Sequence, residues 1–242
     1  MRALIGSTGF VGGNLLRQMQ FTDLYSSVNI GQISGRTLEL IVCAGAPGTK
    51  WIANTHPIKD RRSIDKLMAA LDGVRGSPIV ILISTVDVYG EPRAVDENTA
   101  PYAADDYGEN RAGLELFVAT RFERYRIYRL PALFGEGLKK NALFDLMHGK
   151  NTCQISPNAI YQWYPVERLW RDILTIRHRV VNLATEPITM AAIRDSFFRD
   201  IELGPPSNDP LRYDVRSIYA ANGYHLQRDE VLTEMEKFLA DA

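Results

Sequence analysis

The sequence has few of the residues that build disulfide-rich or metal-binding proteins. It has two cysteines, Cys43 and Cys153, among 242 residues, too few for a disulfide framework. Cys43 lies in the apolar run LELIVCAGA, where a buried thiol is the simplest interpretation. The four histidines show no metal-ligand spacing with each other or with the cysteines. We therefore expect no metal site and a reducing, cytoplasmic environment.

An excess of charge of one sign is also missing. The chain has 28 Lys and Arg against 29 Asp and Glu, a formal net charge of -1, which favours neither nucleic acid nor an anionic membrane as a partner. No apolar run is long enough to cross a bilayer, and the first residues, MRALIGSTGF, predict a strand instead of a signal peptide. Apolar residues make up 45% of the chain, enough for a sizeable core.

Strand-like apolar segments alternate with segments of helical periodicity. Strands are predicted at 3–5, 27–30, 38–44, 79–83 and 126–130, and helices at 11–20, 60–71, 107–122 and 229–240. Continuous apolar runs such as IVILI are typical of strands buried on both faces of a parallel sheet. The alternation predicts βαβ units. We expect residues 1–132 to form a dinucleotide-binding domain, and residues 133–242 to form a substrate lobe that returns part of its chain to the sheet.

A glycine-rich turn follows the first predicted strand and opens the first helix. Its sequence, GSTGFVG at 6–12, is a G-x-x-G-x-x-G pattern in the context that makes such a pattern meaningful. Gly6 allows the tight turn, Gly9 lets the backbone approach a pyrophosphate, and Gly12 lets the helix pack close to the sheet. The candidate cofactor-binding residues of this turn are Gly6, Thr8, Gly9, Phe10, Val11 and Gly12. The alternative is a glycine turn that binds no ligand.

The residues after the predicted second strand lack the acid that often binds the ribose 2′-hydroxyl of NAD. The segment Val28–Arg36 holds no Asp or Glu. Asn29 and Arg36 suit a 2′-phosphate better, because a guanidinium can bind a phosphate through two parallel hydrogen bonds. The sequence therefore favours NADP over NAD as cofactor. The alternative is that Arg36 is a surface turn residue.

Five segments, taken in order, resemble one protein family. They are the glycine turn, CAGA at 43–46, ISTVDVYG at 83–90, YGENR at 107–111 and RLPALFG at 129–135. Over residues 1–141 the chain resembles the extended short-chain dehydrogenase/reductases, which include the NAD(P)-dependent epimerases and dehydratases of nucleotide sugars. The resemblance implies an α/β fold, a Rossmann-type doubly wound parallel sheet with a small C-terminal substrate lobe. It also implies cofactor contacts from Cys43, Ala44, Gly45, Ser84, Tyr107, Arg111 and Pro131.

The resemblance assigns the chemistry to a tyrosine. Tyr107 stands at the acid/base position of the family's Y-x-x-x-K pattern, and Thr85 at the position of a hydroxyl that orients the substrate. Arg111 replaces the family's lysine; it keeps the positive charge but cannot readily lose a proton. We expect cofactor binding and a Tyr107 made more acidic by Arg111, the alternative being an ordinary i, i+4 helix pair. Asp87 is a further catalytic candidate, or a hydrogen-bonded loop residue.

The expected substrate-binding residues are less regular. In sugar-nucleotide enzymes an arginine commonly binds the substrate diphosphate, and a tyrosine takes its place here at the start of YQWYPVER, 161–168. Asn141, with Lys139 and Lys140, offers another anion-binding segment, unless it is a solvated helix start. Trp51 and Trp163 are candidates for stacking on a substrate, with core packing as the alternative.

The sequence predicts an NAD(P)-dependent oxidoreductase or epimerase/dehydratase-like enzyme. It would transfer hydride at a carbinol carbon of a small substrate, such as a sugar or nucleotide sugar. Three departures from the family leave a second hypothesis open, a non-catalytic NAD(P)-binding sensor or scaffold. They are Arg111 in place of lysine, the short segment 30–38 on the adenine side, and the lack of the arginine that commonly binds the substrate diphosphate. A third is that no dinucleotide binds. In relatives, helices matching 60–71 and 106–122 pair between subunits, which implies a possible homodimer.

Overall fold

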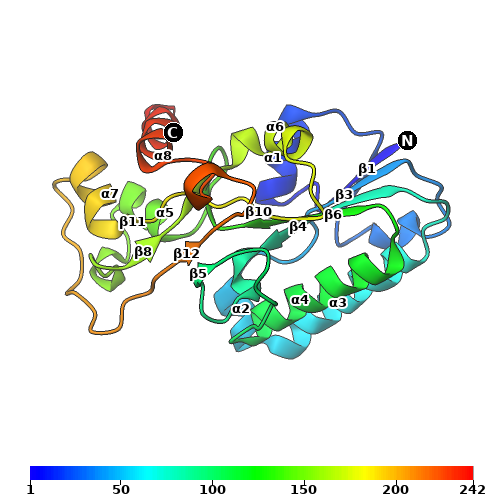
Figure 1. Ribbon diagram of the computed structural model, residues 1–242, viewed down its shortest axis with the longest axis horizontal. Coiled ribbons are helices and arrows are strands. Elements are labelled where there is room, and N and C mark those ends of the chain that lie inside the picture. Colours follow the sequence, from blue (N-terminus) through cyan, green and yellow to red (C-terminus); the bar gives the residue numbers. More distant parts are fainter. Residues whose placement is uncertain (242) are drawn as a thin grey trace. The chain divides into compact units, whose positions relative to one another are not determined.

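The computed structural model describes residues 1–241, which form two compact units. Unit 1 consists of residues 1–91, 97–130 and 167–182. Unit 2 consists of residues 92–96 and 131–166 and of the chain from 183 onward. The chain therefore leaves unit 1 at residue 130, and returns to it before it completes unit 2 (Figure 1).

Unit 1 is built on a six-stranded sheet with the strand order β10-β6-β4-β3-β1-β2. The strands are β1 (Arg2–Ile5), β2 (Asp23–Tyr25), β3 (Leu40–Cys43), β4 (Ile79–Thr85), β6 (Tyr125–Leu130) and β10 (Val180–Asn182). All neighbouring strands are parallel. Because β2 lies on one side of β1 and β3 on the other, the order reverses at β1, and open α/β sheets bind ligands at such a switch point. The predicted doubly wound α/β sheet is confirmed.

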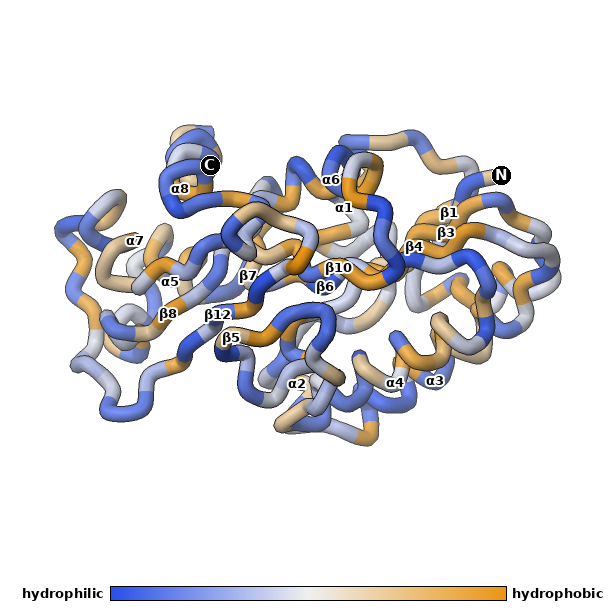
Figure 2. Tube along the Cα trace, viewed as in Figure 1, coloured by the Kyte–Doolittle hydropathy of each residue, from blue (hydrophilic) through white to orange (hydrophobic). Residues whose placement is uncertain are grey.

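Helices cover both faces of this sheet (Figure 1). The helices on one face are α1 (Phe10–Gln18) and α6 (Leu169–Thr175), and those on the other are α2 (Lys50–Thr55), α3 (Pro57–Asp72) and α4 (Asp106–Arg121). The strands carry the apolar residues that this sandwich buries, as the hydropathy of β1, β3 and β4 shows in Figure 2. Ile41 and Val42, on opposite faces of β3, are both fully buried, as expected for a strand covered on both sides.

The second strand is the main departure from the predicted elements. A strand was expected at 27–30, but β2 is Asp23–Tyr25 and a 3₁₀ turn, η1 (Ile30–Ile33), follows it. An edge strand of three residues has one hydrogen-bonded neighbour and little apolar sequence, so its signal is weak. The short connection from η1 to β3 leaves β2 at the edge of the sheet.

Unit 2 contains three two-stranded sheets and three α-helices. Its strands are β5 (Arg93–Val95), β7 (Ala132–Phe134), β8 (Ile160–Tyr161), β9 (Trp163–Pro165), β11 (Ile188–Thr189) and β12 (Asp214–Val215). Its helices are α5 (Ala142–His148), α7 (Met190–Phe197) and α8 (Arg228–Ala240). Helix α8 starts at a capping box of Gln227 and Glu230 and buries Val231 and Met235 in a separate hydrophobic core.

Candidate active site

Two glycines of the turn at 6–12 are required by packing. Gly6 has a φ of 87°, and a Cβ there would lie 2.2 Å from the carbonyl oxygen of Ala44. A Cβ on Gly12 would lie 2.0 Å from the carbonyl oxygen of Gly6, so α1 could not approach the turn. Gly9 has more room, with a Cβ placed 3.3 Å from the same oxygen. The turn is therefore as tight as a phosphate-binding loop needs to be.

The start of α1 is suited to an anion. The helix begins at Phe10, no side chain caps it at Gly9, and its first turn holds no acid. Its first N–H groups and the positive end of its dipole are thus left for a ligand. The backbone N–H groups of Gly6 and Ser7 donate to the carbonyl oxygen of Tyr25 at 2.8 and 3.1 Å, which fixes the turn against the end of β2. A dinucleotide's phosphates fit this cradle.

The predicted loop after β3 forms one wall beside the turn. The backbone N–H of Ala44 donates to the carbonyl oxygen of Ile5 at 2.9 Å, and a Cβ on Gly45 would lie 2.7 Å from the side chain of Ile5. Cys43 is fully buried in the core, and burial raises the pKa of its thiol to about 11. The prediction that Cys43 contacts the cofactor is therefore wrong for its side chain, which packs as a small apolar group.

Tyr107 lies where α4 approaches the end of β4. Asp105 caps α4 by accepting a hydrogen bond of 2.9 Å from the backbone N–H of Gly108. A Cβ on Gly108 would lie 2.3 Å from the carbonyl oxygen of Asp87, so glycine lets the two backbones touch. This close approach places the Tyr107 hydroxyl in hydrogen-bonding reach of the Thr85 hydroxyl. Two residues that the sequence paired as catalytic candidates are thus brought together.

A chain of polar groups continues from Thr85 toward solvent. The Thr85 hydroxyl donates to Oδ2 of Asp87 at 3.1 Å, and Nζ of Lys50 donates to Oδ1 of Asp87 at 2.7 Å. Lys50 also lies 3.3 Å from Oδ2 of Asp105. Burial by itself lowers the pKa of Lys50, but Asp87 and Asp105 outweigh it, and the pKa of Lys50 is raised. Lys50 was not among the residues predicted from the sequence.

Arg111 is buried beneath the ring of Tyr107. Its Cζ lies 4.0 Å from the ring centroid, and its Nη2 donates to Oδ1 of Asp60 at 3.0 Å. Nη1 donates to Oδ2 of Asp60, and Nη2 also donates to the carbonyl oxygen of Pro47. Within residues 1–241, Nε of Arg111 is buried without a hydrogen-bond partner. A buried donor of this kind is costly to leave without an acceptor.

Arg111 lowers the pKa of Tyr107, as expected, but its effect is outweighed. Burial raises the pKa of Tyr107 by more than Arg111 lowers it, and the carboxylate of Asp87 raises it further, so the pKa stands above its usual value. Asp60 compensates the charge of Arg111 through a buried ion pair. The phenol is therefore protonated at neutral pH, and it can act as an acid before it acts as a base.

Ser84 and Trp51 differ in their surroundings. The Ser84 hydroxyl donates to Oε1 of Glu115 at 2.5 Å, and Glu115 forms a buried ion pair of 2.7 Å with Arg129. This network ties β4, α4 and β6 together, so it explains Ser84 without a cofactor.

Trp51 is 68% exposed at the start of α2, next in sequence to Lys50. Its predicted substrate contact stays a prediction.

Arg36 lies at the wrong edge of the sheet for a 2′-phosphate. Its Nη2 lies 2.7 Å from Oδ1 of Asp23 and 3.7 Å from Sδ of Met1, at the amino-terminal ends of β2 and β1. The glycine turn adjoins the other end of β2, at Tyr25. The assignment of Arg36 is therefore corrected; the cause is the misplaced second strand.

Other residues stand at the end of β2 that adjoins the turn. Asn29 holds the local backbone there, since its Oδ1 accepts from the N–H of Ser26 at 2.7 Å and its Nδ2 donates to the carbonyl oxygen of Leu24 at 3.1 Å. A lysine of α3 also reaches this end of β2. Nζ of Lys66 donates to the carbonyl oxygen of Ser27 at 2.8 Å. Asn29 is thus committed to the turn, while Lys66 supplies the charge that was expected from Arg36.

Three predicted residues belong to unit 2. Trp163 is fully buried in that unit's core, 5.3 Å from the ring of Tyr161 between centroids, so its assignment to the substrate is wrong. Asn141 caps α5, its Oδ1 accepting from the N–H of Phe144 at 2.9 Å and its Nδ2 donating to the carbonyl oxygen of Leu133 at 2.8 Å. Pro131 is buried at the start of the unit, and its cofactor contact stays a prediction.

No protein-family model matches this sequence. No curated protein matches it by sequence either. Solved structures do match it. A UDP-glucose 4-epimerase from Thermotoga maritima, with UDP-glucose, has a TM-score of 0.75 at 15% identity, over 100% of this chain and 99% of that one. A dTDP-4-dehydrorhamnose reductase from Clostridium acetobutylicum has a TM-score of 0.75 at 15% identity, over 99% of each chain.

A third similar structure carries a cofactor. It is a dTDP-4-dehydrorhamnose reductase from Bacillus anthracis in complex with NADP, with a TM-score of 0.74 at 16% identity, over 100% of this chain and 99% of that one. The chain shares the Rossmann-type α/β fold of these epimerase and reductase structures. The five segments that resemble this family thus lie on the fold that the family uses.

Between residues 1 and 241, no group of three or more His, Cys, Asp or Glu residues is placed to hold a metal ion. Over the same stretch, every helix is too short or too polar to span a bilayer.

Proposed function

We propose that the protein is an NAD(P)-dependent oxidoreductase or epimerase/dehydratase-like enzyme of the extended short-chain dehydrogenase/reductase type. Its substrate would be a sugar-like alcohol or ketone, with nucleotide sugars as the first class to test. The similar structures support this choice, since they include an epimerase with UDP-glucose and a reductase with NADP. At their level of identity the shared fold alone does not name the reaction.

The observation that carries the proposal is the row of polar groups from Tyr107 to Lys50. The Thr85 hydroxyl lies near enough to Tyr107 to lower the pKa of the phenol. Thr85 donates a hydrogen bond to Asp87, and Lys50 donates one to Asp87. Lys50 is 43% exposed at its side chain, so the chain starts at a buried phenol and ends at water. An isolated structural tyrosine has no need of such a path, whereas an acid/base that must recover its proton does.

This path offers a substitute for the family's lysine. Arg111 cannot pass on a proton, because its guanidinium stays charged at any accessible pH. In the reductive direction Tyr107 gives its proton to the substrate oxygen. Thr85 then passes a proton to the phenolate, Asp87 passes one to Thr85, and Lys50 supplies it and is reprotonated by water.

The cofactor site is proposed at the switch point of the sheet. When bound, the dinucleotide supplies or accepts the hydride. The start of α1 would hold its phosphates, and the unpartnered Nε of Arg111 would donate to a ribose hydroxyl. Lys66 would face a 2′-phosphate from its position at Ser27, which supports the NADP preference on a different residue from Arg36.

A second candidate is a dinucleotide-binding sensor or scaffold without turnover. The raised pKa of Tyr107, which burial and Asp87 cause, and the pairing of Arg111 with Asp60 favour it. A sensor needs the cradle at α1 but not the path from Tyr107 to Lys50. A cytoplasmic location and a homodimer through α3 and α4 stay predictions under either function.

The test separates binding from turnover. The melting temperature is measured with NADPH, NADH, NADP+ and NAD+, since a ligand at a hundred times its dissociation constant adds about 2.7 kcal/mol. Cofactor oxidation or reduction is then followed with a panel of nucleotide sugars and 4-keto sugars. Tyr107→Phe should bind cofactor as the wild type does and lose turnover by roughly 10²–10⁴-fold. Equal binding with no turnover in either protein would support the sensor, and no binding at all would exclude both.

A further inference from the structure

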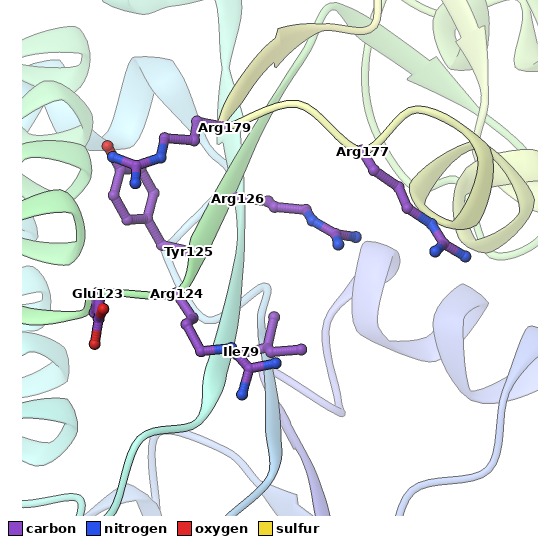
Figure 3. A pocket seen from close by; sticks show the side chains of 7 residues that line it. All are labelled: Ile79, Glu123, Arg124, Tyr125, Arg126, Arg177 and Arg179. Atoms are coloured by element: carbon purple, nitrogen blue, oxygen red, sulfur yellow. The ribbon is translucent and has the colours of Figure 1, made fainter.

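A strongly basic pocket lies on unit 1, away from the proposed active site (Figure 3). It has a volume of about 240 Å³. The residues that line it are Ile79, Glu123, Arg124, Tyr125, Arg126, Arg177 and Arg179. They come from the start of β4, the start of β6 and the segment between α6 and β10. The pocket thus opens at the amino-terminal edge of the parallel sheet, whereas the glycine turn lies at the carboxyl-terminal edge.

The two sites are well separated within the same unit. Strand β6 runs from Tyr125, at the pocket, to Leu130. A strand of this length spans roughly 20 Å at about 3.3 Å per residue. An anion in the basic pocket therefore cannot contact the start of α1, and the pocket is not an extension of the cofactor site.

Four arginines gather in this pocket without acidic partners. Within residues 1–241, none of them lies within 4.0 Å of a carboxylate. Glu123 is exposed, and in Figure 3 its side chain points away from the guanidinium groups of Arg126 and Arg177. The whole chain has a net charge of -1, so this local excess of positive charge is not a reflection of composition.

The arginine side chains are held in place by neutral groups. Nε of Arg177 donates to the carbonyl oxygen of Leu174 at 2.6 Å, and Cζ of Arg179 lies 5.4 Å from the ring centroid of Tyr125. Burial raises the pKa of the Tyr128 hydroxyl, and the nearby Arg126 and Arg177 oppose this rise. These two arginines come from β6 and from the segment after α6. Of the four side chains, Arg177 and Arg179 are thus held by neutral contacts before any anion arrives.

We propose that this pocket binds a small anion with two linked phosphoryl groups, either as free pyrophosphate or as the diphosphate of a nucleotide. Guanidinium groups bind phosphate oxygens in pairs, and their planar donors suit this geometry better than an ammonium does. A single phosphate would leave most of the four arginines unused. The pocket's volume of about 240 Å³ leaves room for a small anion of this kind.

This site is independent of the proposed catalytic function. An anion bound there would bridge β6 to the segment before β10, and so hold the edge strand of the sheet. It would act as a second ligand of the protein, and its stabilising effect would grow with the logarithm of its concentration above the dissociation constant. The proposal stands whether or not Tyr107 turns over a substrate.

The test measures binding of pyrophosphate, inorganic phosphate and ADP to the full chain by calorimetry at one fixed ionic strength. The titrations are made without NADPH, which itself carries a diphosphate, and are then repeated with it; binding at the start of α1 is common to the wild type and all variants, so the comparison among them reports on the pocket. Pyrophosphate and ADP should bind, and inorganic phosphate should bind more weakly. The variant R126Q/R177Q should lose at least about tenfold in affinity for pyrophosphate, since each lost charge-assisted hydrogen bond is a substantial part of binding.

A matched control removes the same charge elsewhere on unit 1. Arg61 and Arg62 are exposed on α3, so R61Q/R62Q should bind pyrophosphate as the wild type does. The second pocket variant, R124Q/R179Q, changes exposed side chains and should also lose affinity while keeping the melting temperature of the free protein. It keeps the test decisive if R126Q/R177Q folds poorly.

The outcomes separate the proposal from its rivals. Equal losses in R61Q/R62Q and R126Q/R177Q would reveal a general charge effect and overturn it. Unchanged binding in both pocket variants would place the anion elsewhere and overturn it too. Binding of an RNA oligonucleotide or an acidic peptide, with no binding of pyrophosphate or ADP, would replace the small anion with a macromolecular partner. If NADPH does not bind at all, the proposed function fails while the comparison of variants remains valid.

Discussion

The ammonium group of Lys50 lies 2.7 Å from one carboxylate oxygen of Asp87, and the other oxygen of Asp87 accepts a hydrogen bond from Thr85. The pair joins a six-residue helix to the end of β4. It stabilises the conformation of the α2 segment only modestly, because Lys50 is partly exposed and solvent screens such pairs. Its main consequence is chemical, since it links the buried Tyr107 to water.

The first prediction concerns this link. Lys50→Met should lower the turnover number by about 10²-fold and leave cofactor affinity unchanged, because it removes the proton source and not the phosphate cradle. Steady-state kinetics and a binding titration on the same protein measure the two effects. Lys59→Met is the control, since Lys59 is exposed on α3. A Lys50→Met enzyme with full turnover would remove Lys50 from the mechanism.

The second prediction uses two adjacent glycines of α1. Gly12→Ala should destabilise the protein by several kcal/mol, on the order of other severe packing clashes, because its Cβ would meet the carbonyl oxygen of Gly6 at 2.0 Å. A Cβ on Gly13 would have no neighbouring atom within 4 Å. Gly13→Ala should therefore stabilise the helix by about 0.5–1 kcal/mol. Urea unfolding of both variants measures the difference, and a stable Gly12→Ala protein would contradict the turn geometry.

The third prediction concerns the buried pair of Arg111 and Asp60. Asp60→Ala leaves the guanidinium of Arg111 buried without a counter-charge, so the free energy of unfolding should fall by about 3–5 kcal/mol. The double variant Asp60→Ala/Arg111→Met should recover part of this loss, since no uncompensated charge remains. Denaturant unfolding of the two single variants and the double variant gives the coupling energy. Additive losses would mean that the two side chains act independently.

The fourth prediction concerns cofactor choice. Lys66→Gln should weaken NADPH binding about tenfold and leave NADH binding unchanged, because the loss of one phosphate contact costs roughly 1.4 kcal/mol. Arg36→Gln should change neither affinity, since Arg36 is paired with Asp23 at the other edge of the sheet. Parallel titrations with both cofactors provide the measurement. The reverse pattern would restore Arg36 as the residue that selects NADP.

The fifth prediction is a pH dependence. Burial raises the pKa of the Cys43 thiol to about 11, above its ordinary value. The folded thiol binds its proton more tightly than the unfolded one, so this stabilisation is complete below the unfolded pKa and is lost as the pH rises through about 11. The difference in melting temperature between wild type and Cys43→Ala should therefore shrink as the pH rises toward about 11.

Near pH ~8 a thiol reagent should modify the exposed Cys153 alone until denaturant is added.

Local patterns account for what could be predicted from the sequence. The turn at 6–12 and the run IVILI in β4 each carry their own signal within a few residues. These features need no knowledge of the rest of the chain, because glycine spacing and strand burial are local in sequence. Tyr107 was assigned differently, through the resemblance of five ordered segments to one family.

The features that were missed depend on distant pairs. Lys50 meets Asp87 across 37 positions, and Arg111 meets Asp60 across 51. A helix of six residues such as α2 has too little periodicity to be noticed. The placement of Arg36 failed for a related reason. The second strand starts at residue 23 and not at the predicted residue 27. Arg36 was therefore expected at the carboxyl-terminal edge of the sheet, but its side chain lies near Asp23.

The route of the chain through unit 1 has a consequence for synthesis on the ribosome. The sheet gains β10 after residues 131–166 have already been used for unit 2. Until residue 182 has emerged, β6 has no neighbour on its outer side, and an unpaired edge of this kind is prone to join other chains. A nascent chain of this protein therefore carries an open strand while residues 131–182 are made, which is the interval in which a chaperone would protect it.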